Sequence, residues 1–430
     1  MPDLPELPEV LSDRAVGPGD RRYPRLRSTY TKVHSPKLIL MPRNASEVAA
    51  AVVFAGASEM PLSVRSGGHG LSGRSSNDGG IVVDLSELDR IEVIDRDARI
   101  VRIGPGARWA TVADALAPYG WAISSGDHGN VGVGGLATAG GIGWFARSYG
   151  LTIDHIRAVD VVLADGRQVR ADADNEPDLF WAMRGAGDSV GIAVAFEIEA
   201  VPLPDVGVAQ LVLEADRNGD TLRRWSEHLA DAPLELTTNG IMFSQGGSFL
   251  LQLTAVVADG NLKLAKPLGK LGLRLVDQHA QLAPYSALVP TGHLHPNMGQ
   301  QRSISTSGLL PTLTRGSARA LMDASAHPSS PLLHLRSVGG AINAVDREAT
   351  AYPHRHQQVL AILSEFPPSG GAELDAAWHA VLPYVDGAYR NFESRPTERT
   401  FRQAFPGVAG DRVSKLRDHF DPAGVLRRQT

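Results

Sequence analysis

The residues best suited to chemistry in this sequence are one histidine, His69, and two glycine-dense loops, at 67–73 and 126–143. Each loop follows a segment whose composition predicts a β-strand. Glycine allows positive φ and lets a ligand approach the main chain closely. Successive free N–H groups in such loops form concave sites for a phosphate or pyrophosphate. The pattern therefore predicts a phosphate-bearing cofactor held by both loops, with His69 at the tip of the first.

The segments around these loops mix predicted strands, hairpins and helices. Alternating apolar residues predict strands, whereas apolar residues three or four positions apart predict helices. Asp165-Gly166 suits a tight primed turn, which makes 158–171 the clearest hairpin of the chain. The other expected elements are strands at 61–66, 81–86 and 192–201, a hairpin at 90–106, and helices at 109–119 and 178–187.

Pro202 and Pro204 mark the expected end of this first region. Beyond them the pattern predicts a sheet covered by helices. The expected strands lie at 206–214, 235–243, 248–258, 272–278 and 332–340, and the expected helices at 219–230, 260–270, 316–326, 355–366 and 373–385. Three parts are therefore predicted: residues 1–203, 204–386 and 387–430, the last ending in a helix from Val408 to His419.

The composition limits what the chain can do. Its 430 residues suffice for two domains, and a formal net charge of −5 argues against a nucleic-acid partner. Because the sequence has no cysteine, disulfides, thiolate metal sites and a cysteine nucleophile are excluded. The N-terminus does not read as a secretory signal, and the longest apolar run, Val48 to Ala57, is too short to span a membrane. A cytoplasmic protein without a membrane partner is expected.

A dinucleotide-binding fold is the main rival for the cofactor loops. Gly132-Val-Gly134 resembles the start of a GxGxxG motif, but Ala137 stands where the third glycine belongs. The expected acidic residue about 20 positions further on is also missing. A P-loop is absent, since GK[ST] does not occur.

Two histidine pairs, His293/His295 and His354/His356, invite a metal interpretation. An i,i+2 spacing puts both members of a pair on one face only in a strand, and no carboxylate stands with them in a ligand-like pattern. Structural or substrate-contacting roles are favoured, and no metal site is predicted.

Six segments, in their order along the chain, resemble one flavoprotein family. They are RSGGHG (65–70), GVGGLATAGGIGW (132–144), SYGLTIDHI (148–156), DLFWAMRGAG (178–187), ATAYPHR (349–355), and AYRNF with LRDHFDPAGVLR (388–427). The set resembles the vanillyl-alcohol-oxidase/p-cresol-methylhydroxylase superfamily, and within it the berberine-bridge-enzyme-like oxidases, including bacterial 6-hydroxynicotine-oxidase-like members. The resemblance implies an α+β fold, with a two-subdomain FAD-binding domain of the PCMH type and a substrate domain whose antiparallel sheet is covered by helices.

The family also implies where FAD binds: between two N-terminal subdomains, with its pyrophosphate against main-chain amides of both glycine loops. The residues expected to bind it are Arg65, Ser66, Gly67, Gly68, His69, Gly70, Ser72, Gly126, Gly132, Gly134, Gly135, Leu136, Thr138, Ala139, Gly140, Gly141, Gly143, Ile192, Val194 and Asn391. Residues 188–191 read DSVG where relatives often have GNFG, so contacts on the adenine side do not carry over residue by residue.

The flavin-linking histidine of the family falls on His69. The resemblance implies a covalent bond from this ring to the flavin 8α-methyl group, and the alternative is a histidine that only hydrogen-bonds to FAD. Many relatives carry a second linkage through a cysteine in the pattern G-x-C-P-x-V-G. This chain reads Gly126-Asp-His128-Gly-Asn-Val-Gly132 there, so single attachment follows. His128 would lie near the flavin as a polar wall or a proton acceptor.

The implied reaction is removal of hydride from a substrate carbon bearing O–H or N–H to flavin N5, with O₂ as the electron acceptor. A base that takes the hydroxyl or amine proton makes the carbon a better hydride donor. The family's Y-x-N motif assigns this role to Tyr389, with Asn391 two residues on. Because an ordinary tyrosine pKa is ~10, a neighbouring cation must assist; the candidates are Arg390, Arg355 and the histidines. The alternative is that Tyr389 is a packed aromatic.

Tyr352 would face the flavin from the substrate domain, ordered by His354 and Arg355, although a structural role is open for all three. The expected substrate is a small cyclic alcohol, sugar or amine from catabolism or secondary metabolism. Two other functions stay compatible with a flavin site: a non-redox cyclisation or isomerisation, and ligand binding without turnover. A homodimer is compatible with the sequence, which does not give the oligomeric state.

Overall fold

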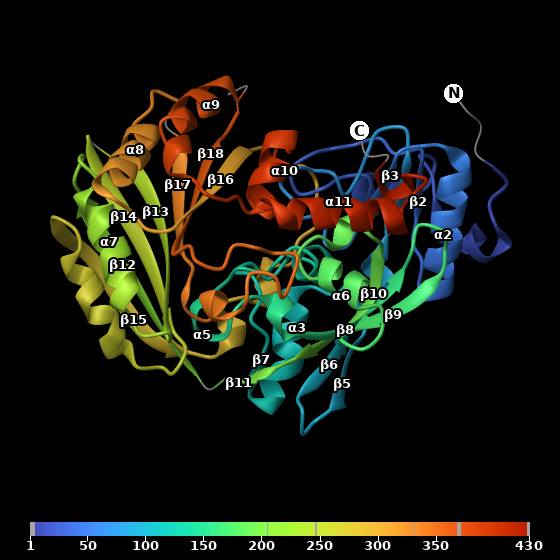
Figure 1. Cartoon of the computed structure of the whole chain (residues 1–430), viewed down its shortest axis with the longest axis horizontal. Coiled ribbons are helices and arrows are strands. Elements are labelled where there is room, and N and C mark those ends of the chain that lie inside the picture. Colours follow the sequence, from blue (N-terminus) through green and yellow to red (C-terminus); the bar gives the residue numbers. More distant parts are fainter. Residues whose placement is uncertain (1–4, 204, 246, 330, 368–370, 428–430) are drawn as a thin grey trace.

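The computed structural model describes residues 5–203, 205–245, 247–329, 331–367 and 371–427. The elements form two regions side by side (Figure 1): two small sheets from the first half of the chain, and one large sheet from the second half. The last helices return across the first region, so both labelled ends of the chain lie on that side (Figure 1). Among the described residues, none of the helices combines the length and the hydropathy that a membrane span needs.

The first small sheet carries the loop that contains His69. Its elements are β1 (Ala15–Val16), β2 (Leu38–Leu40), β3 (Leu62–Arg65) and β4 (Ile81–Asp84), with α1 (Tyr23–Leu26) and α2 (Ala45–Ser58). The strand order is β1-β2-β4-β3; β2, β4 and β3 are parallel, as the α2 connection between β2 and β3 requires. Asn44 caps α2, because its side chain accepts a hydrogen bond from the N–H of Glu47 at 2.9 Å. β3 ends directly before the glycine loop.

The second small sheet has five antiparallel strands in the order β5-β6-β10-β8-β9. They are β5 (Ile91–Asp95), β6 (Ile100–Ile103), β8 (Ile156–Val162), β9 (Gln168–Asp172) and β10 (Ile192–Glu199), accompanied by the short pair β7 (Trp121–Ala122) and β11 (Val201–Pro202) and by α3 (Trp109–Leu116), α4 (Val133–Ala137), α5 (Ala146–Tyr149) and α6 (Pro177–Met183). The predicted hairpins at 90–106 and 158–171 are confirmed, and Gly166 has the expected positive φ of 85°. The second glycine loop leads into α4.

The large sheet is antiparallel throughout, in the order β15-β12-β14-β13-β17-β18-β16. Its strands are β12 (Val206–Ala215), β13 (Leu236–Gln245), β14 (Ser248–Val257), β15 (Arg274–Ala283), β16 (Ile304–Leu310), β17 (Leu332–Ser337) and β18 (Val359–Glu365). Helices α7 (Asp220–Asp231), α8 (Arg315–Ser325) and α9 (Ala372–His379) cover the face turned away from the first region (Figure 1). Trp225, Leu321 and Leu374 anchor these helices in a shared apolar core with the sheet. The predicted helix-covered antiparallel sheet is confirmed.

The prediction of a helix at 355–366 is wrong, because this segment contains strand β18. β18 lies between β17 and β16, and its seven residues are all buried. A short apolar run has the same composition in a buried strand and in a buried helix, so periodicity cannot decide between them. Strand β16 has no counterpart among the predicted strands, and the segment predicted as a helix at 260–270 is a 3₁₀ helix, Leu262–Lys270, with Pro267 inside it.

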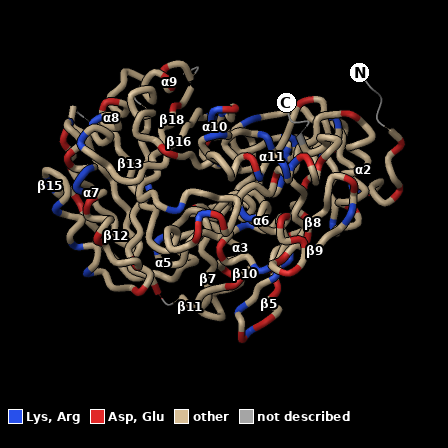
Figure 2. The backbone as a smooth tube through the Cα atoms, viewed as in Figure 1, with Lys and Arg blue, Asp and Glu red and all other residues tan. Residues whose placement is uncertain are grey.

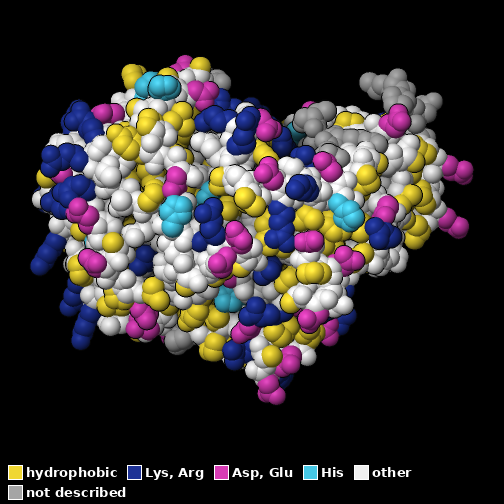
Figure 3. All heavy atoms as spheres, viewed as in Figure 1, with side chains coloured by type: hydrophobic (Ala, Val, Ile, Leu, Met, Phe, Trp, Pro, Cys, Tyr) yellow, Lys and Arg dark blue, Asp and Glu magenta, His cyan; other side chains and the backbone are white. Residues whose placement is uncertain are grey.

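The C-terminal part ends in α10 (Glu398–Ala404) and α11 (Val408–Phe420), so the predicted helix at its end is confirmed. α11 packs on α6 of the first region. There Arg412 pairs with Asp178 at 2.6 Å and its guanidinium lies 4.1 Å from the centre of the Trp181 ring. Acidic and basic residues are interspersed over both regions (Figure 2), and the face drawn in Figure 3 mixes charged and hydrophobic side chains. The boundaries proposed at 203/204 and 386/387 stay predictions.

Candidate functional site

A cavity of about 1130 Å³ lies where the two regions meet. Its walls come from both glycine loops, from residues 188–193, from the uncovered face of the large sheet and from the segment 388–405. Typical small-molecule pockets measure ~300–1,000 Å³. The cavity therefore has room for a cofactor and a substrate together.

The two glycine loops touch each other at this cavity. A Cβ atom on Gly67 would lie 2.3 Å from the backbone nitrogen of Gly132, and one on Gly132 would lie 2.3 Å from the nitrogen of Gly67. Arg108 ties the loops together, since its Nη1 donates to the carbonyl oxygens of Gly67 at 2.6 Å and Asn130 at 2.5 Å. Asn297 also donates to the Gly67 carbonyl, at 2.8 Å. The loops thus form one fixed main-chain surface.

This surface presents hydrogen-bond donors. For the backbone N–H groups of residues 67–71, no acceptor is found among the described residues. Gly68 has a φ of 64°, a left-handed conformation that favours glycine. Unpaired N–H groups on a concave loop are suited to an anion such as the pyrophosphate of FAD.

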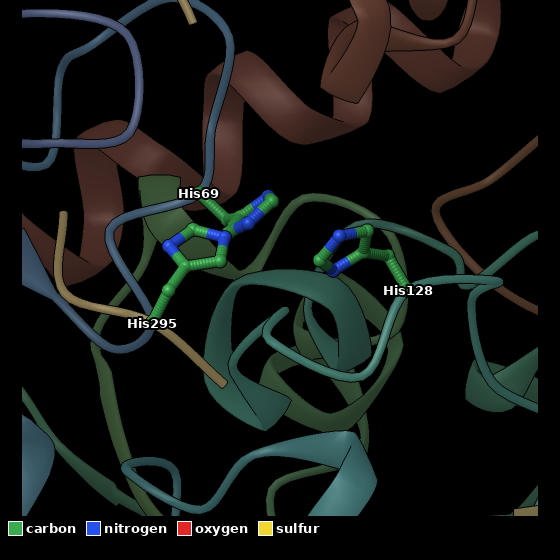
Figure 4. Close-up of side chains that lie close together, drawn as sticks. All are labelled: His69, His128 and His295. Atoms are coloured by element: carbon green, nitrogen blue, oxygen red, sulfur yellow. The ribbon is translucent and has the colours of Figure 1, made fainter. Parts of the chain in front are cut away.

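His69 lies beside this surface on the cavity wall. Its ring stacks on Tyr30, with the ring centres 4.0 Å apart, and lies 5.0 Å from the ring of His128 and 5.8 Å from that of His295 (Figure 4). Burial lowers the pKa of His69 to about 3, with smaller contributions from the charges of His128, Arg108 and His295. Its buried Nε2 finds no hydrogen-bond partner among the described residues. The ring is therefore neutral at ordinary pH.

The structure brings most of the predicted cofactor residues to the cavity. Those on its wall are Ser66, Gly67, Gly68, His69, Gly70, Ser72, Gly126, Gly132, Gly134, Gly135, Leu136, Thr138, Ala139, Ile192 and Asn391, and the predicted catalytic residues Tyr389 and His128 join them. Together with the unpaired donors and the unpartnered imidazole nitrogen, this set fits FAD.

The cavity wall does not include Arg65, Gly140, Gly141, Gly143, Val194 and Tyr352. Arg65 instead forms a buried ion pair with Asp84 at 2.6 Å. Gly141 and Gly143 serve the packing of their own loop, because a Cβ on them would lie 2.0 Å from Thr152 Oγ1 and 1.8 Å from the carbonyl oxygen of Ser125. Motif position alone cannot separate a glycine that faces a ligand from one that faces the protein.

Tyr389 is buried at the cavity wall. Its hydroxyl oxygen accepts hydrogen bonds from the N–H of Gly141 at 3.0 Å and from Asn391 Nδ2 at 3.1 Å. Burial raises the pKa of Tyr389, and the two hydrogen bonds and the positive charge of Arg336 oppose that rise. Donors aimed at the oxygen favour its deprotonated form, although the net effect of the surroundings is to raise the pKa of Tyr389.

The cation beside Tyr389 is not one of the two predicted arginines. Arg355 forms a buried ion pair with Asp154 at 2.7 Å, and Arg390 pairs with Asp188. Tyr352 packs edge-on against Tyr389 with ring centres 6.2 Å apart, and burial raises its pKa. Arg336 is the arginine whose charge reaches Tyr389.

His354 lies deep in the protein. Its Nε2 lies 3.0 Å from the carbonyl oxygen of Ala404, and burial lowers its pKa to about 4. His356, the other member of the pair, is bound to Asp386 at 2.7 Å. This pair therefore ties chain segments together.

The sequence reasoning missed the polar face of β17. His334 and Arg336 line the cavity, and Arg336 pairs with Asp127 of the second glycine loop at 2.6 Å. Burial lowers the pKa of His334 to about 4. Leu333 and Leu335, which alternate with them along the strand, belong to the core that holds the helices. The alternation LLHLRS was the available signal, since side chains two apart share one face of a strand.

Comparison with known proteins identifies the first region. Residues 36–172 match a family model described as "FAD binding domain". The chain is 35% identical over 199 residues to (R)-6-hydroxynicotine oxidase of Paenarthrobacter nicotinovorans, an alignment that covers 46% of this chain and only 43% of that protein. It is 29% identical to xylooligosaccharide oxidase of Thermothelomyces thermophilus, covering 91% of this chain and 86% of the relative. It is also 29% identical to berberine bridge enzyme-like 12 of Arabidopsis thaliana, covering 99% and 90%.

Solved structures share the fold over nearly the whole chain. Chitooligosaccharide oxidase superposes with a TM-score of 0.87 at 21% identity, covering 98% of this chain and 99% of that one. The berberine-bridge-enzyme-like protein 1 of Physcomitrella patens gives a TM-score of 0.87 at 22% identity, covering 98% and 97%. In sequence and in fold, the chain is thus similar to the berberine-bridge-enzyme-like FAD-linked oxidases of the p-cresol-methylhydroxylase/vanillyl-alcohol-oxidase superfamily.

Proposed function

We propose that this protein is an FAD-dependent oxidase that takes hydride from a carbon bearing O–H or N–H in a small cyclic substrate, with O₂ as the electron acceptor. The observation that carries the proposal is the single cavity that joins both glycine loops and His69 to Tyr389 and the polar face of the large sheet. Bound FAD would supply the hydride acceptor. The chain supplies binding, orientation and proton transfer.

The loops and His69 divide the task of holding the cofactor. The unpaired N–H groups of residues 67–71 would bind the diphosphate. His69 would attach the flavin covalently, and a neutral ring with an unpartnered nitrogen supports this role. With no cysteine in the chain, attachment through His69 alone is the proposed arrangement.

Tyr389 is the proposed base. Its phenolate oxygen would take the proton of the substrate hydroxyl or amine, which makes the adjacent carbon a better hydride donor. The N–H of Gly141, the amide of Asn391 and the charge of Arg336 all favour that phenolate. Asp127 holds Arg336 in place through their ion pair.

The polar wall supports a polar substrate. His334, Arg336, Ser305 and Ser364 line the substrate side of the cavity, and the relatives named above act, by their names, on 6-hydroxynicotine and on xylooligosaccharides. A cyclic alcohol, sugar or amine is therefore the proposed class.

Acid precipitation tests the attachment. The yellow colour should stay in the pellet of the unchanged protein and move to the supernatant for His69→Ala, while His279→Ala, a change at an exposed histidine on β15, should keep it in the pellet. Yellow supernatant from the unchanged protein would refute covalent attachment.

Anaerobic mixing with a panel of cyclic alcohols, sugars and amines tests the reaction class. Bleaching of the flavin band is expected with a true substrate, followed by recovery when O₂ is admitted. Product formation without bleaching would favour the non-redox alternative.

A further inference from the structure

Three histidines from distant parts of the chain meet beside the cofactor loops. His69 belongs to the first glycine loop, His128 to the second, and His295 to the segment between β15 and β16 (Figure 4). One ring nitrogen of each lies within 4.8 Å of the others. Neither the family motifs nor the proposed reaction accounts for the arrival of His295 at this point.

Two of the three rings, those of His69 and His128, are in the protonation state that metal binding needs. Burial lowers the pKa values of His69 and His128, so both rings are neutral at ordinary pH, and neutral imidazole is the form that binds metals. Nε2 of His69 has no partner among the described residues. His128 Nδ1 accepts from the N–H of Asn130 at 3.2 Å, and Asn130 Nδ2 lies 3.2 Å from each ring nitrogen of His295. The hydrogen bond to His128 is long, and one ring nitrogen of a neutral His295 carries a lone pair, so a cation could replace an Asn130 contact at each ring; Nδ1 of His295 also lies 3.0 Å from Gln300 Nε2.

The donor set selects the kind of metal. Imidazole nitrogens suit Zn²⁺, Ni²⁺, Co²⁺ and Cu²⁺, whereas Mg²⁺ and Ca²⁺ require oxygen ligands. The nearby carboxylate of Asp127 is held by Arg336. Zinc–nitrogen bonds of ~2.0–2.1 Å in a tetrahedron put nitrogens about 3.4 Å apart, so side-chain rotations would close the present spacing around one ion.

We propose that, before FAD is attached, the chain binds one divalent transition-metal ion through His69, His128 and His295, with water completing the coordination. The ion and the flavin exclude each other, because both take His69; this second statement rests on the proposed function. In the metal-bound chain, His69 cannot bond to the flavin until the ion dissociates.

The test uses the full chain produced in riboflavin-starved cells, stripped with a chelator and titrated with Co²⁺. One Co²⁺ per chain is expected, with the visible absorption of a histidine-bound ion. His128→Gln and His295→Gln should each weaken binding about tenfold or more, while His279→Gln, the exposed control, should not. Equal binding by the unchanged chain and both cluster variants would overturn the site.

A second measurement needs no variant. Zn²⁺ should raise the melting temperature of the stripped chain, and EDTA should reverse the rise, because a ligand that binds only the folded state stabilises it. Absence of a shift at Zn²⁺ concentrations that saturate the Co²⁺ site would contradict the proposal. Zn²⁺ should also slow incorporation of added FAD.

The flavin-loaded protein separates this proposal from the proposed function. If flavin stays in the acid pellet and Co²⁺ binds only the stripped chain, both stand. If flavin stays in the pellet and the stripped chain binds no Co²⁺, the metal site is refuted and the attachment survives. If Co²⁺ binds the stripped and the flavin-loaded chain equally, the mutual exclusion of metal and flavin is refuted. If the flavin of that sample also stays soluble in acid, the covalent attachment through His69 is refuted as well.

Discussion

The two regions build their walls of the cavity in different ways. The first region contributes main chain: two glycine loops that touch so closely that a Cβ on Gly67 or Gly132 would lie within 2.3 Å of the other loop. The large sheet contributes side chains, such as His334 and Arg336, which alternate with core leucines along one strand. A main-chain site constrains residue type strictly, whereas strand side chains can be exchanged without changing the fold. Under the proposed function, the backbone of the glycine loops would hold the diphosphate of the cofactor, and side chains of the sheet would meet the substrate.

The strongest test of this comparison concerns the contact that joins the regions. Arg355 and Asp154 form a buried ion pair across the interface, with side chains 3% and 8% exposed. Arg355→Leu leaves the carboxylate buried and uncompensated, so a loss of about 3–5 kcal/mol in the free energy of unfolding is expected. Denaturant titration of the loaded protein measures it.

The matched control is Arg157→Leu, which breaks an exposed ion pair with Glu199 and should cost less than about 1 kcal/mol. Adding Asp154→Asn to Arg355→Leu should recover part of the loss by removing the unpaired charge. Equal costs for Arg355→Leu and Arg157→Leu would mean that the interface does not depend on this pair.

The main-chain wall is tested by adding one methyl group. Gly132→Ala forces a Cβ against the backbone of the other loop, and a loss of about 1–3 kcal/mol is expected from overpacking, together with weaker FAD retention. Gly19→Ala is the control, since this exposed glycine lies outside the cavity wall and nothing lies within 4 Å of its Cβ position. Thermal denaturation of both variants measures the difference in stability. Equal melting temperatures would show that the loops can move apart to accommodate the methyl group.

The side-chain wall is tested at Arg336. Without its charge the pKa of Tyr389 rises further, so the acid limb of the kcat/KM profile should move to higher pH in Arg336→Gln. Arg336→Lys should keep much of the charge and most of the profile. Arg402→Gln, at an exposed pair with Glu398, is the control. An unmoved limb in Arg336→Gln would remove Tyr389 from the role of base.

The smallest expected effect is the pH dependence of stability. His69 and His334, one from each wall, have pKa values lowered to about 3 and about 4, whereas an unfolded histidine titrates near ~6.5. Protons therefore bind the unfolded chain more readily than the folded chain. The free energy of unfolding is highest above about pH 6.5, where both histidines are neutral in either state, and it falls as the pH drops toward 4.

At roughly pH 5.5, each of these histidines should lower the free energy of unfolding of the cofactor-free chain by about 1.4 kcal/mol. Comparing unfolding at that pH and at neutral pH for His69→Asn and His334→Asn measures the two contributions, with the exposed His279→Asn as control. Unchanged pH slopes in both variants would show that neither ring is buried in its neutral form.

The same contrast explains which predictions from sequence held. Hairpins such as 158–171 and the glycine loops are local: turn residues and strand alternation fix them within a few positions. Strand β18 was mistaken for a helix because its identity depends on neighbours β16 and β17, and the short apolar run is compatible with both structures. The ordering cation was assigned to arginines close in sequence to tyrosines. Arg336 instead reaches Tyr389 because the segment that carries Tyr389 pairs with β16 of the same sheet.

By itself, the sequence determined the flavoprotein motifs, the α+β class, the absence of a cysteine linkage and the position of His69 at a loop tip, because each depends on residue types and local patterns along the chain. The tertiary structure decided which glycines face the cavity, which arginine acts on Tyr389, and that His295 joins His69 and His128. Those relations hold between residues that are far apart along the chain. They are set by how the strands pair and how the two regions pack, and a local sequence pattern does not predict either.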